Sequence, residues 1–382
     1  MKGVVGFLAI AFFAGCGPDG GAIHHGTGGN VDAGMSPPGT GGGGGVPLPQ
    51  PDLLPPDPNA DYDHDGASIA QGDCNDWEPL VGPNAVEVTG NMTDDDCDGM
   101  VDETEALCDS AAAGKTDAPS LAQAIDSCDS RFLLEAKIVG PSDVRARSIV
   151  PTFGIVGKQA GGAMALLSTG LAVDKMGTGW VKPQNGTNLA QTNTSANPDP
   201  NLPAAMGCGS SQPATVNDYT ELSLKLRVPQ NANSFSFQFH FFSAEYPEFV
   251  CTTYNDEFLV EMTSTHEYPT ATNISFDAGK NPITVNNGFF TVCDNYAAKP
   301  QTQHCTKPVS DIAGTGYEDS DGSKPIGGST GWLTTTAPVT PGEEVTLRFI
   351  IFDEGDHIYD SSVLIDNFQW SVKAVGGPVT IP

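Results

Sequence analysis

The sequence predicts a mainly β protein with an antiparallel β-sandwich or jelly-roll-like domain and one short helix. In residues 234–242, phenylalanine occupies every second position, so four rings fall on one side of an extended strand. Residues 222–228 alternate leucine or valine with polar residues, and each of these strands is expected to have one wet face. Residues 345–351 and 364–372 continue the pattern between Gly, Asn, Asp and Pro turns. Many short strands separated by turns favour two packed antiparallel sheets.

The chain begins with the pattern of an export signal, residues 1–15. A positive residue precedes an apolar stretch, residues 4–13, which is too short to span a bilayer. Residues 13–16 resemble the bacterial lipobox, which implies that Cys16 is lipidated and becomes the mature N-terminus. Ordinary signal cleavage with an unmodified Cys16 is the alternative. Because Gly17 follows, the resemblance implies an exported lipoprotein with a lipid anchor in the membrane, at the outer membrane or cell surface.

Residues 16–59 predict a disordered tether. They contain an unbroken glycine run, residues 41–45, and a proline-rich stretch, residues 47–58, with almost no apolar periodicity. The ends of a flexible coil of this length lie roughly 35–40 Å apart on average. Such a tether would hold the folded part of the chain away from the membrane.

Residues 60–107 predict a small loop-rich module stabilised by a disulfide and metal ions. Sixteen Asp or Glu and no Lys or Arg lie between Asp57 and Asp109, so over half of the net charge of −30 is local to this stretch. The few large apolar residues cannot build a core, so the disulfide and the ions must supply what burial does not. The acidic balance argues against a nucleic-acid partner, because phosphates need Lys and Arg.

Two loops of the module, residues 61–66 and 94–99, place aspartates at alternate positions before a glycine. Carboxylates spaced in this way converge on one point, as Ca²⁺ with its oxygen ligands requires, and without a cation they would repel one another. We expect one to three Ca²⁺ ions. The candidate ligands of the first loop are Asp61, Asp63, Asp65, Asp73 and Asp76. Those of the second loop are Asp94, Asp96, Asp98, Met100 through its carbonyl, Asp102 and Glu105.

The second loop fits an EF-hand loop better than the first, although no flanking helices are apparent. Counted from Asp94, it has Asp102 at position nine and Glu105 at position twelve. Position twelve of the first loop is Gly72, so Asp73 or Asp76 must complete its ligand set. The pattern is therefore EF-like.

Residues 117–130 form the one segment with a helical pattern. Asp117 or Ser120 can cap its start. Apolar residues then recur at helical spacing on one face: Leu121, Ala124, Ile125 and Cys128.

Eight cysteines remain when Cys16 is set aside, and an even number in an exported chain indicates disulfides. Few histidines and the lack of a Cys-x-x-Cys motif argue against a zinc site. Connectivity cannot be fixed by sequence, but order and spacing favour Cys74–Cys97, Cys108–Cys128, Cys208–Cys251 and Cys293–Cys305.

Acidic and amide side chains also recur at strand ends of the sandwich domain, expected over 108–373 and followed by a tail over 374–382. Oxygen ligands from separate loops could form a second-domain metal site. Its candidates are Glu245, Asn255, Asp256 and Asp366, with Asp353 and Asp360 nearby in sequence. The alternative is that these residues cap turns and accept hydrogen bonds from backbone N–H groups.

The acidic stretch closely resembles the MopE-type metal-binding motif of exported bacterial proteins. The resemblance rests on residues 61–66, 72–76 and 94–103. It implies copper, because the family takes its name from a copper-binding surface protein. The residues themselves favour Ca²⁺, since copper prefers imidazole or sulfur and carboxylates here outnumber the lone His64, which is expected to point outward.

Residues 108–373 resemble the choice-of-anchor L domain. The segments that carry the resemblance are 120–128, 163–171, 241–249, 254–258 and 360–367. Members of this family are attached to cell surfaces by varied anchors, which matches the lipobox. The resemblance therefore implies a place in the cell and adds no chemistry.

Enzyme signatures are weak, because a nucleophile elbow, a His-Glu-x-x-His pair and a phosphate-binding glycine loop are all missing from the sequence. We expect a cell-surface lipoprotein whose calcium-binding module supports a β-sandwich for adhesion, recognition or envelope structure. Its ligand would be an extracellular glycan or protein. The alternatives are a polysaccharide hydrolase, with carboxylates drawn from Glu245, Glu257 or Asp353, and a copper-binding surface protein.

Overall fold

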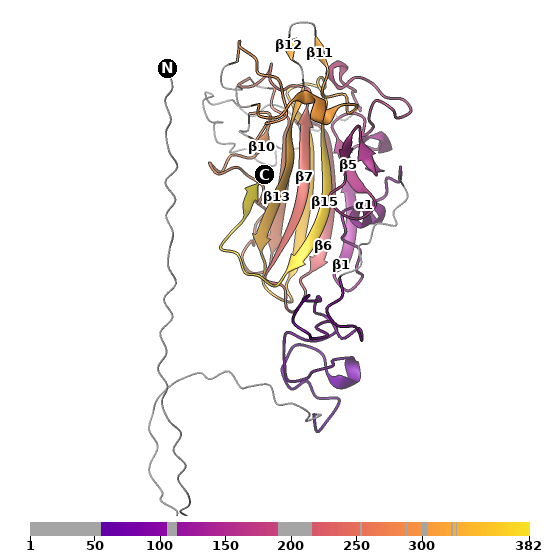
Figure 1. Ribbon diagram of the computed structural model, residues 1–382, viewed down its shortest axis with the longest axis vertical. Helices are drawn as coiled ribbons and strands as arrows, with labels where there is room; N and C mark the ends of the chain where they lie inside the picture. Colours follow the sequence, from indigo (N-terminus) through magenta and orange to yellow (C-terminus); the bar gives the residue numbers. More distant parts are fainter. Residues whose placement is uncertain are drawn as a thin grey trace, which may run out of the picture. The chain divides into compact units, whose positions relative to one another are not determined.

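Two antiparallel sheets pack face to face in the computed structural model (Figure 1). The structure describes residues 55–104, 113–189, 216–252, 254–286, 289–299, 305–321, 324–325 and 327–382. The predicted signal, Cys16 and nearly all of the tether lie outside these residues. Pro51–Pro382 cluster into one unit, which contains both the acidic module and the sandwich. No helix in the described part of the chain is both long and apolar enough for a membrane span.

The first sheet has its strands in the order β1-β6-β14-β8-β10, with β9 also paired to β8. Its strands are β1 (Leu133–Val139), β6 (Val216–Arg227), β14 (Glu344–Glu354), β8 (Glu257–Ser264), β10 (Ile283–Thr284) and β9 (Thr272–Asn273). The second sheet has the order β16-β13-β7-β15-β5-β2. Its strands are β16 (Val379–Ile381), β13 (Gly328–Pro338), β7 (Ser234–Ser243), β15 (Ser361–Ser371), β5 (Met164–Ser168) and β2 (Arg147–Val150). Two short hairpins, β3 (Thr152–Phe153) with β4 (Val156–Gly157) and β11 (Ser320–Asp321) with β12 (Lys324–Pro325), lie outside the sheets.

The long strands alternate between the sheets along the chain: β6, β8 and β14 belong to the first, and β7, β13 and β15 to the second. Pairings such as Val216 with Glu354, Phe352 with Glu257 and Ser361 with Ser243 gather several strand ends at one end of the sandwich. The β6–β7 connection lies at the opposite end. Side chains that are far apart in sequence therefore meet at each end.

The core lies between the sheets and is formed by the alternating residues that the sequence indicated. Phe235, Phe237, Phe239 and Phe241 of β7 are fully buried. The Phe237 ring meets the Phe349 ring edge to face, with centroids 5.1 Å apart. Burying each such ring stabilises the fold by about 1.5–3 kcal/mol relative to leaving it exposed.

The prediction of a wet face on the strand at residues 234–242 is wrong at His240. This side chain is 4% exposed, stacks on Phe242 at 4.1 Å and pairs with Ser329 Oγ at 2.7 Å. A second apolar cluster, which includes Ile312 and Tyr317, covers this outer face of the sheet.

The predicted helix is shorter than expected. Helix α1 spans Ala118–Ala124, and the Asp117 side chain caps it by accepting a hydrogen bond from Ser120 N at 3.0 Å. It ends early because Asp126 has a φ of 67°, which an α-helix cannot accommodate. The other described helical segments are single 3-10 turns: Ile69–Gln71, Val144–Ala146, Pro183–Asn185 and Val309–Ile312.

Two of the expected disulfides are present among the described residues. Cys74–Cys97 joins the two halves of the acidic module, and Cys293–Cys305 closes a loop of the sandwich. Cys128 and Cys251 are also disulfide-bonded. Their expected partners, Cys108 and Cys208, lie outside the described residues.

Candidate metal centre

The two acidic loops have the same backbone turn. The glycine at position six donates its N–H to the first aspartate at 3.1 Å in both loops, Gly66 to Asp61 and Gly99 to Asp94. Both glycines have a positive φ, 99° and 95°, which residues with a Cβ rarely adopt. The sequence repeat is therefore a structural repeat.

The fourth position of each loop is also left-handed. It is filled by His64, with φ 67°, and by Cys97, with φ 58°. Non-glycine residues adopt this conformation uncommonly, although histidine does so more often than most. Cys97 is held there by its disulfide to Cys74, which follows Asp73 of the first half and so fixes the two acidic loops side by side.

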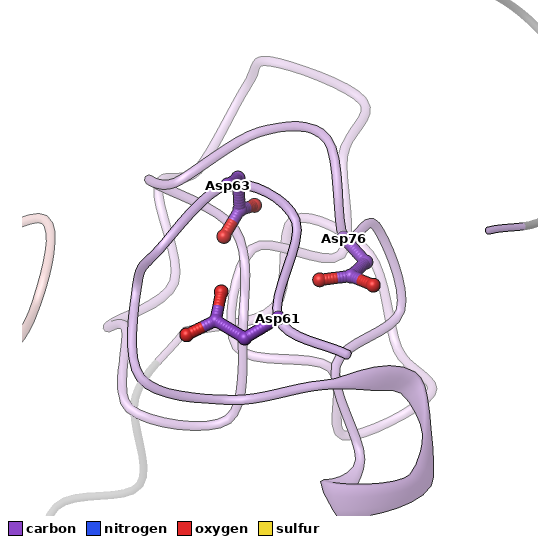
Figure 2. Close-up of side chains that lie close together, drawn as sticks. All are labelled: Asp61, Asp63 and Asp76. Carbon is purple, nitrogen blue, oxygen red and sulfur yellow. The ribbon is translucent and has the colours of Figure 1, made fainter. Parts of the chain in front are cut away.

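The first loop brings all five of its predicted ligands into two groups that share Asp63. Oxygens of Asp61, Asp63 and Asp76 lie within 4.8 Å of one another, and so do oxygens of Asp63, Asp65 and Asp73. Figure 2 shows the carboxylates of Asp61, Asp63 and Asp76 turned toward one another. This spacing suits oxygens that share one Ca²⁺ ion, since each would lie about 2.3–2.6 Å from it.

Several oxygens of these groups are buried without a hydrogen-bond donor among the described residues. They are Asp63 Oδ2, Asp73 Oδ2 and Asp76 Oδ2. Burial, with the neighbouring carboxylates Asp65 and Asp61 adding to it, raises the pKa of Asp63 to about 6, and the pKa of Asp73 is also raised to about 6. The Oδ1 atom of each carboxylate accepts a backbone hydrogen bond, but the Oδ2 atom has no such partner among the described residues, and a cation would supply one.

The second loop uses a partly different set of carboxylates. Glu87, Asp94 and Asp96 form one group, and Asp96, Asp98 and Glu103 form another. Sequence spacing did not single out Glu87 or Glu103. Glu103 lies within the acidic run, but Glu87 is seven residues before the loop and reaches it only through the fold.

One predicted ligand of the second loop, Asp102, has another role. Asp102 Oδ1 accepts hydrogen bonds from the backbone N–H groups of residues 90–92 at 2.5–3.1 Å, so this carboxylate caps a turn. The Met100 side chain is exposed, and the contribution of its carbonyl stays a prediction. Glu105 lies outside the described residues.

Ligand carboxylates of both loops also contact the sandwich. Arg131, just before β1, donates to Asp96 Oδ2 at 3.2 Å, and Gln230, in the β6–β7 connection, donates to Asp65 Oδ2 at 2.6 Å. A Cβ at Gly82 would lie 2.6 Å from Asp65 Oδ2 and 2.7 Å from Gln230 Nε2, so a larger residue there would displace this contact. Asn231 adds two hydrogen bonds to the Val86 backbone, at 3.0 and 2.7 Å.

The candidates in the sandwich separate into different sites. Glu245 and Asp256 meet Asp353, and the three carboxylates form a buried group. Asn255 Oδ1 instead accepts a hydrogen bond from Asn286 at 2.8 Å. Asp366 accepts from Gln159 N at 2.5 Å and from Ala160 N.

Among the described residues, the geometry matches neither glycoside hydrolysis nor copper binding. Glu245, Glu257 and Asp353, the carboxylates considered for glycoside hydrolysis, are each at most 1% exposed and cannot reach a polysaccharide. His64, the lone imidazole in the acidic loops, is exposed and belongs to none of the carboxylate groups.

Comparison with known proteins gives two family matches. Residues 73–103 match the family described as "Putative metal-binding motif", which is of the MopE type, and residues 163–369 match the family described as "Choice-of-anchor L domain". No curated protein and no solved structure matches the chain. Both resemblances seen in the sequence are thereby confirmed.

These matches and the disulfides indicate an exported, surface-associated protein that carries a metal-binding module. The second match, residues 163–369, covers more than half of the 382 residues. The chain belongs to the choice-of-anchor L domain family.

Proposed function

We propose that the acidic module binds Ca²⁺ and that these ions stiffen a joint between a lipid-anchored tether and a β-sandwich used for adhesion or recognition. The observation that carries the proposal is the convergence of carboxylates in two equivalent loops, with buried oxygens that lack donors among the described residues. A cation at each group would satisfy those oxygens and cancel their mutual repulsion.

The ligand chemistry favours calcium over copper. Every group in the two loops consists of Asp and Glu oxygens, which suit hard cations, whereas copper prefers imidazole or sulfur. The cysteines of the module are engaged in the Cys74–Cys97 disulfide, so they supply no thiolate.

A structural role for the ions follows from the contacts of the module. Asp65 and Asp96 each belong to a carboxylate group and each contact the sandwich, through Gln230 and Arg131. Ions that order these two carboxylates would also hold the module on this end of the sandwich. In sequence the module separates the predicted tether from the sandwich, so a stiff module would set how the sandwich is presented.

Terbium luminescence tests the calcium proposal. Tb³⁺ takes the place of Ca²⁺ at oxygen sites, and its emission is sensitised by nearby indole and phenol rings. Tyr62 lies between two ligands of the first loop and its ring is 5.2 Å from that of Trp77, which follows Asp76. We expect sensitised Tb³⁺ emission that Ca²⁺ displaces and that Asp61→Asn/Asp63→Asn lowers by the share of the first loop.

The control is Asp57→Asn, which removes an exposed charge just before the module and outside the carboxylate groups. This variant should retain the emission. Undiminished emission in Asp61→Asn/Asp63→Asn, or copper binding that excess Ca²⁺ does not reverse, would contradict the proposal. The recognition role is tested separately by glycan-array binding of the full exported chain, and an array without any bound glycan would argue against a glycan ligand.

A further inference from the structure

The end of the sandwich opposite the acidic module gathers three carboxylates from distant parts of the chain. Glu245 follows β7, Asp256 immediately precedes β8, and Asp353 lies near the end of β14. The strand pairings place these three strand ends together, because Phe352 of β14 pairs with Glu257 of β8. Nothing in the local sequence spacing links these residues.

The three side chains form a closed group. One oxygen from each lies within 4.8 Å of the others, and the residues are 1%, 0% and 0% exposed, respectively. Asp256 N donates to Glu245 Oε2 at 3.2 Å, which orients the glutamate toward the aspartates. We name this group the sandwich triad.

The oxygens of the two aspartates are unpaired. Neither oxygen of Asp256 and neither oxygen of Asp353 has a hydrogen-bond donor among the described residues. Four such oxygens in one buried place are costly, because an unmatched carboxylate loses its hydration without compensation. A ligand that accepts electron pairs from all of them would remove this cost.

The surrounding charges make the cost larger. The charged side chains that act most strongly on the triad, apart from its own members, are Asp356, Glu354 and Asp360, and all three are acidic. Burial and this acidic surrounding raise the pKa values of Glu245, Asp256 and Asp353 well above their usual range. The triad must therefore take up either protons or a cation.

We infer that the sandwich triad of Glu245, Asp256 and Asp353 binds a divalent cation of the Ca²⁺ type, separate from the ions of the acidic module. Hard carboxylate oxygens at this spacing suit Ca²⁺, which shares about 2.3–2.6 Å contacts among ligands of flexible geometry. Mg²⁺ is less suited, since it usually retains several waters and the three carboxylates of this site are buried. The ion would pin the 244–256 segment, which carries Phe249 and Tyr254, to the end of β14.

The test is the number of Ca²⁺ ions bound per chain, measured by elemental analysis on the full exported chain and on Asp256→Asn/Asp353→Asn. We expect this variant to lose one ion while Tb³⁺ emission near Trp77 is unchanged. The melting transition of the sandwich should rise with Ca²⁺ in the wild type and stay constant in the variant. In EGTA the variant should melt at or above the wild type, because two uncompensated charges are gone.

The matched control is Asp366→Asn, which changes another fully buried aspartate of the sandwich that accepts backbone hydrogen bonds and lies outside the triad. It should retain the full number of ions. The inference would be overturned if Asp256→Asn/Asp353→Asn bound as many Ca²⁺ ions as the wild type and its sandwich melting temperature rose equally with Ca²⁺.

A second variant covers the case in which the triad variant fails to fold. In Asp61→Asn/Asp63→Asn/Asp94→Asn/Asp96→Asn the module loops are disabled and the triad is intact. If this variant still binds one Ca²⁺ and its sandwich still melts at a higher temperature with Ca²⁺, the triad site is supported. Complete loss of Ca²⁺ contradicts it. Failure of Tb³⁺ binding at the loops alone would contradict only the proposed function of the module.

Discussion

The acidic module and the β-sandwich are held together by different physics, although both belong to one unit of the chain. The sandwich buries whole phenylalanine rings between its sheets, including Phe237, Phe349 and Phe258. The buried apolar residues of the module are small: Ala67, Val81, Ala85 and Val86. Buried apolar area therefore stabilises the sandwich, whereas the module depends on its disulfide, its contacts with the sandwich and cations.

The comparison shows that the two regions compensate their acidic side chains in different ways. In the sandwich, Arg348 pairs with Glu221 at 2.8 Å and with Glu261, so two acidic side chains on the first sheet have an internal partner. The stretch 57–109, which contains the module, has sixteen acidic residues and no Lys or Arg. Its compensation must come from outside the stretch, from Arg131 and from ions.

The largest effect is expected from truncating the sandwich core. Phe237→Ala should lower the free energy of unfolding of the sandwich by about 3–5 kcal/mol, because it removes a fully buried ring packed on Phe349. Urea unfolding at fixed Ca²⁺ measures this. Tb³⁺ emission from the module should be unchanged. Ser236→Ala, which changes the neighbouring residue on the half-buried face of the strand, should have little effect on stability. A loss below about 1 kcal/mol in Phe237→Ala would contradict the assignment of the core.

Removing the module disulfide should cost somewhat less. Cys74→Ser/Cys97→Ser is expected to lower the stability of the module by about 3 kcal/mol, because it releases a loop with a sequence separation of 23. Saturating Ca²⁺ should offset part of this loss, since ions and disulfide restrain the same two loops. Limited proteolysis followed by mass spectrometry measures cleavage within 60–104. Cys293→Ser/Cys305→Ser is the control. Its module should resist proteolysis as well as the wild-type module does.

The pH dependence of the module should change sign with calcium. Burial raises the pKa of Asp63 and Asp73 from 3.8 to about 6, so the metal-free folded module binds more protons than the unfolded chain between about pH 4 and 6. Its stability must then fall as pH rises through this window. With Ca²⁺ present, protons compete with the ion, so protection by Ca²⁺ should weaken as pH falls below about 6. Proteolytic protection in EGTA that increases from pH 5 to pH 7 would refute this.

The smallest effect is expected at the contact between module and sandwich. Arg131→Gln removes the ion pair with Asp96 at 3.2 Å and should cost about 1 kcal/mol or less, because the arginine side chain is 32% exposed. Hydrogen exchange of the 80–96 segment should show the change. Lys137→Gln, which breaks an exposed pair with Glu135, is the matched control and should leave this segment unaffected.

Sequence periodicity predicted the strands of the sandwich well, because burial on one face imposes a period of two. It failed where later segments covered a face, as at His240, and at the end of α1, where the left-handed Asp126 stops the helix. Both acidic loops were predictable because each encodes its own turn, with Gly66 and Gly99 at position six.

Ligands supplied from outside a local turn were predicted only in part: Glu245 and Asp256 were candidates from separate loops, whereas Glu87 was not singled out. Glu87 and Asp353 join carboxylate groups only through the fold, and no spacing in the sequence connects them to their partners. Asp102 fits the EF-hand spacing yet caps a turn, because the 90–92 segment brings three backbone N–H groups to its oxygen. Asp366 likewise satisfies the backbone of the 159–160 segment.

Hydrogen exchange of residues 60–104 in Ca²⁺ and in EGTA tests the dependence of the module on cations most directly. At Ca²⁺ concentrations of 100 times the Kd, chelation should lower protection by about 100-fold, which corresponds to about 2.7 kcal/mol. Asp94→Asn/Asp96→Asn should lack this difference in the second loop, and Asp57→Asn should keep it. Equal protection of the wild-type module in Ca²⁺ and in EGTA would contradict the account.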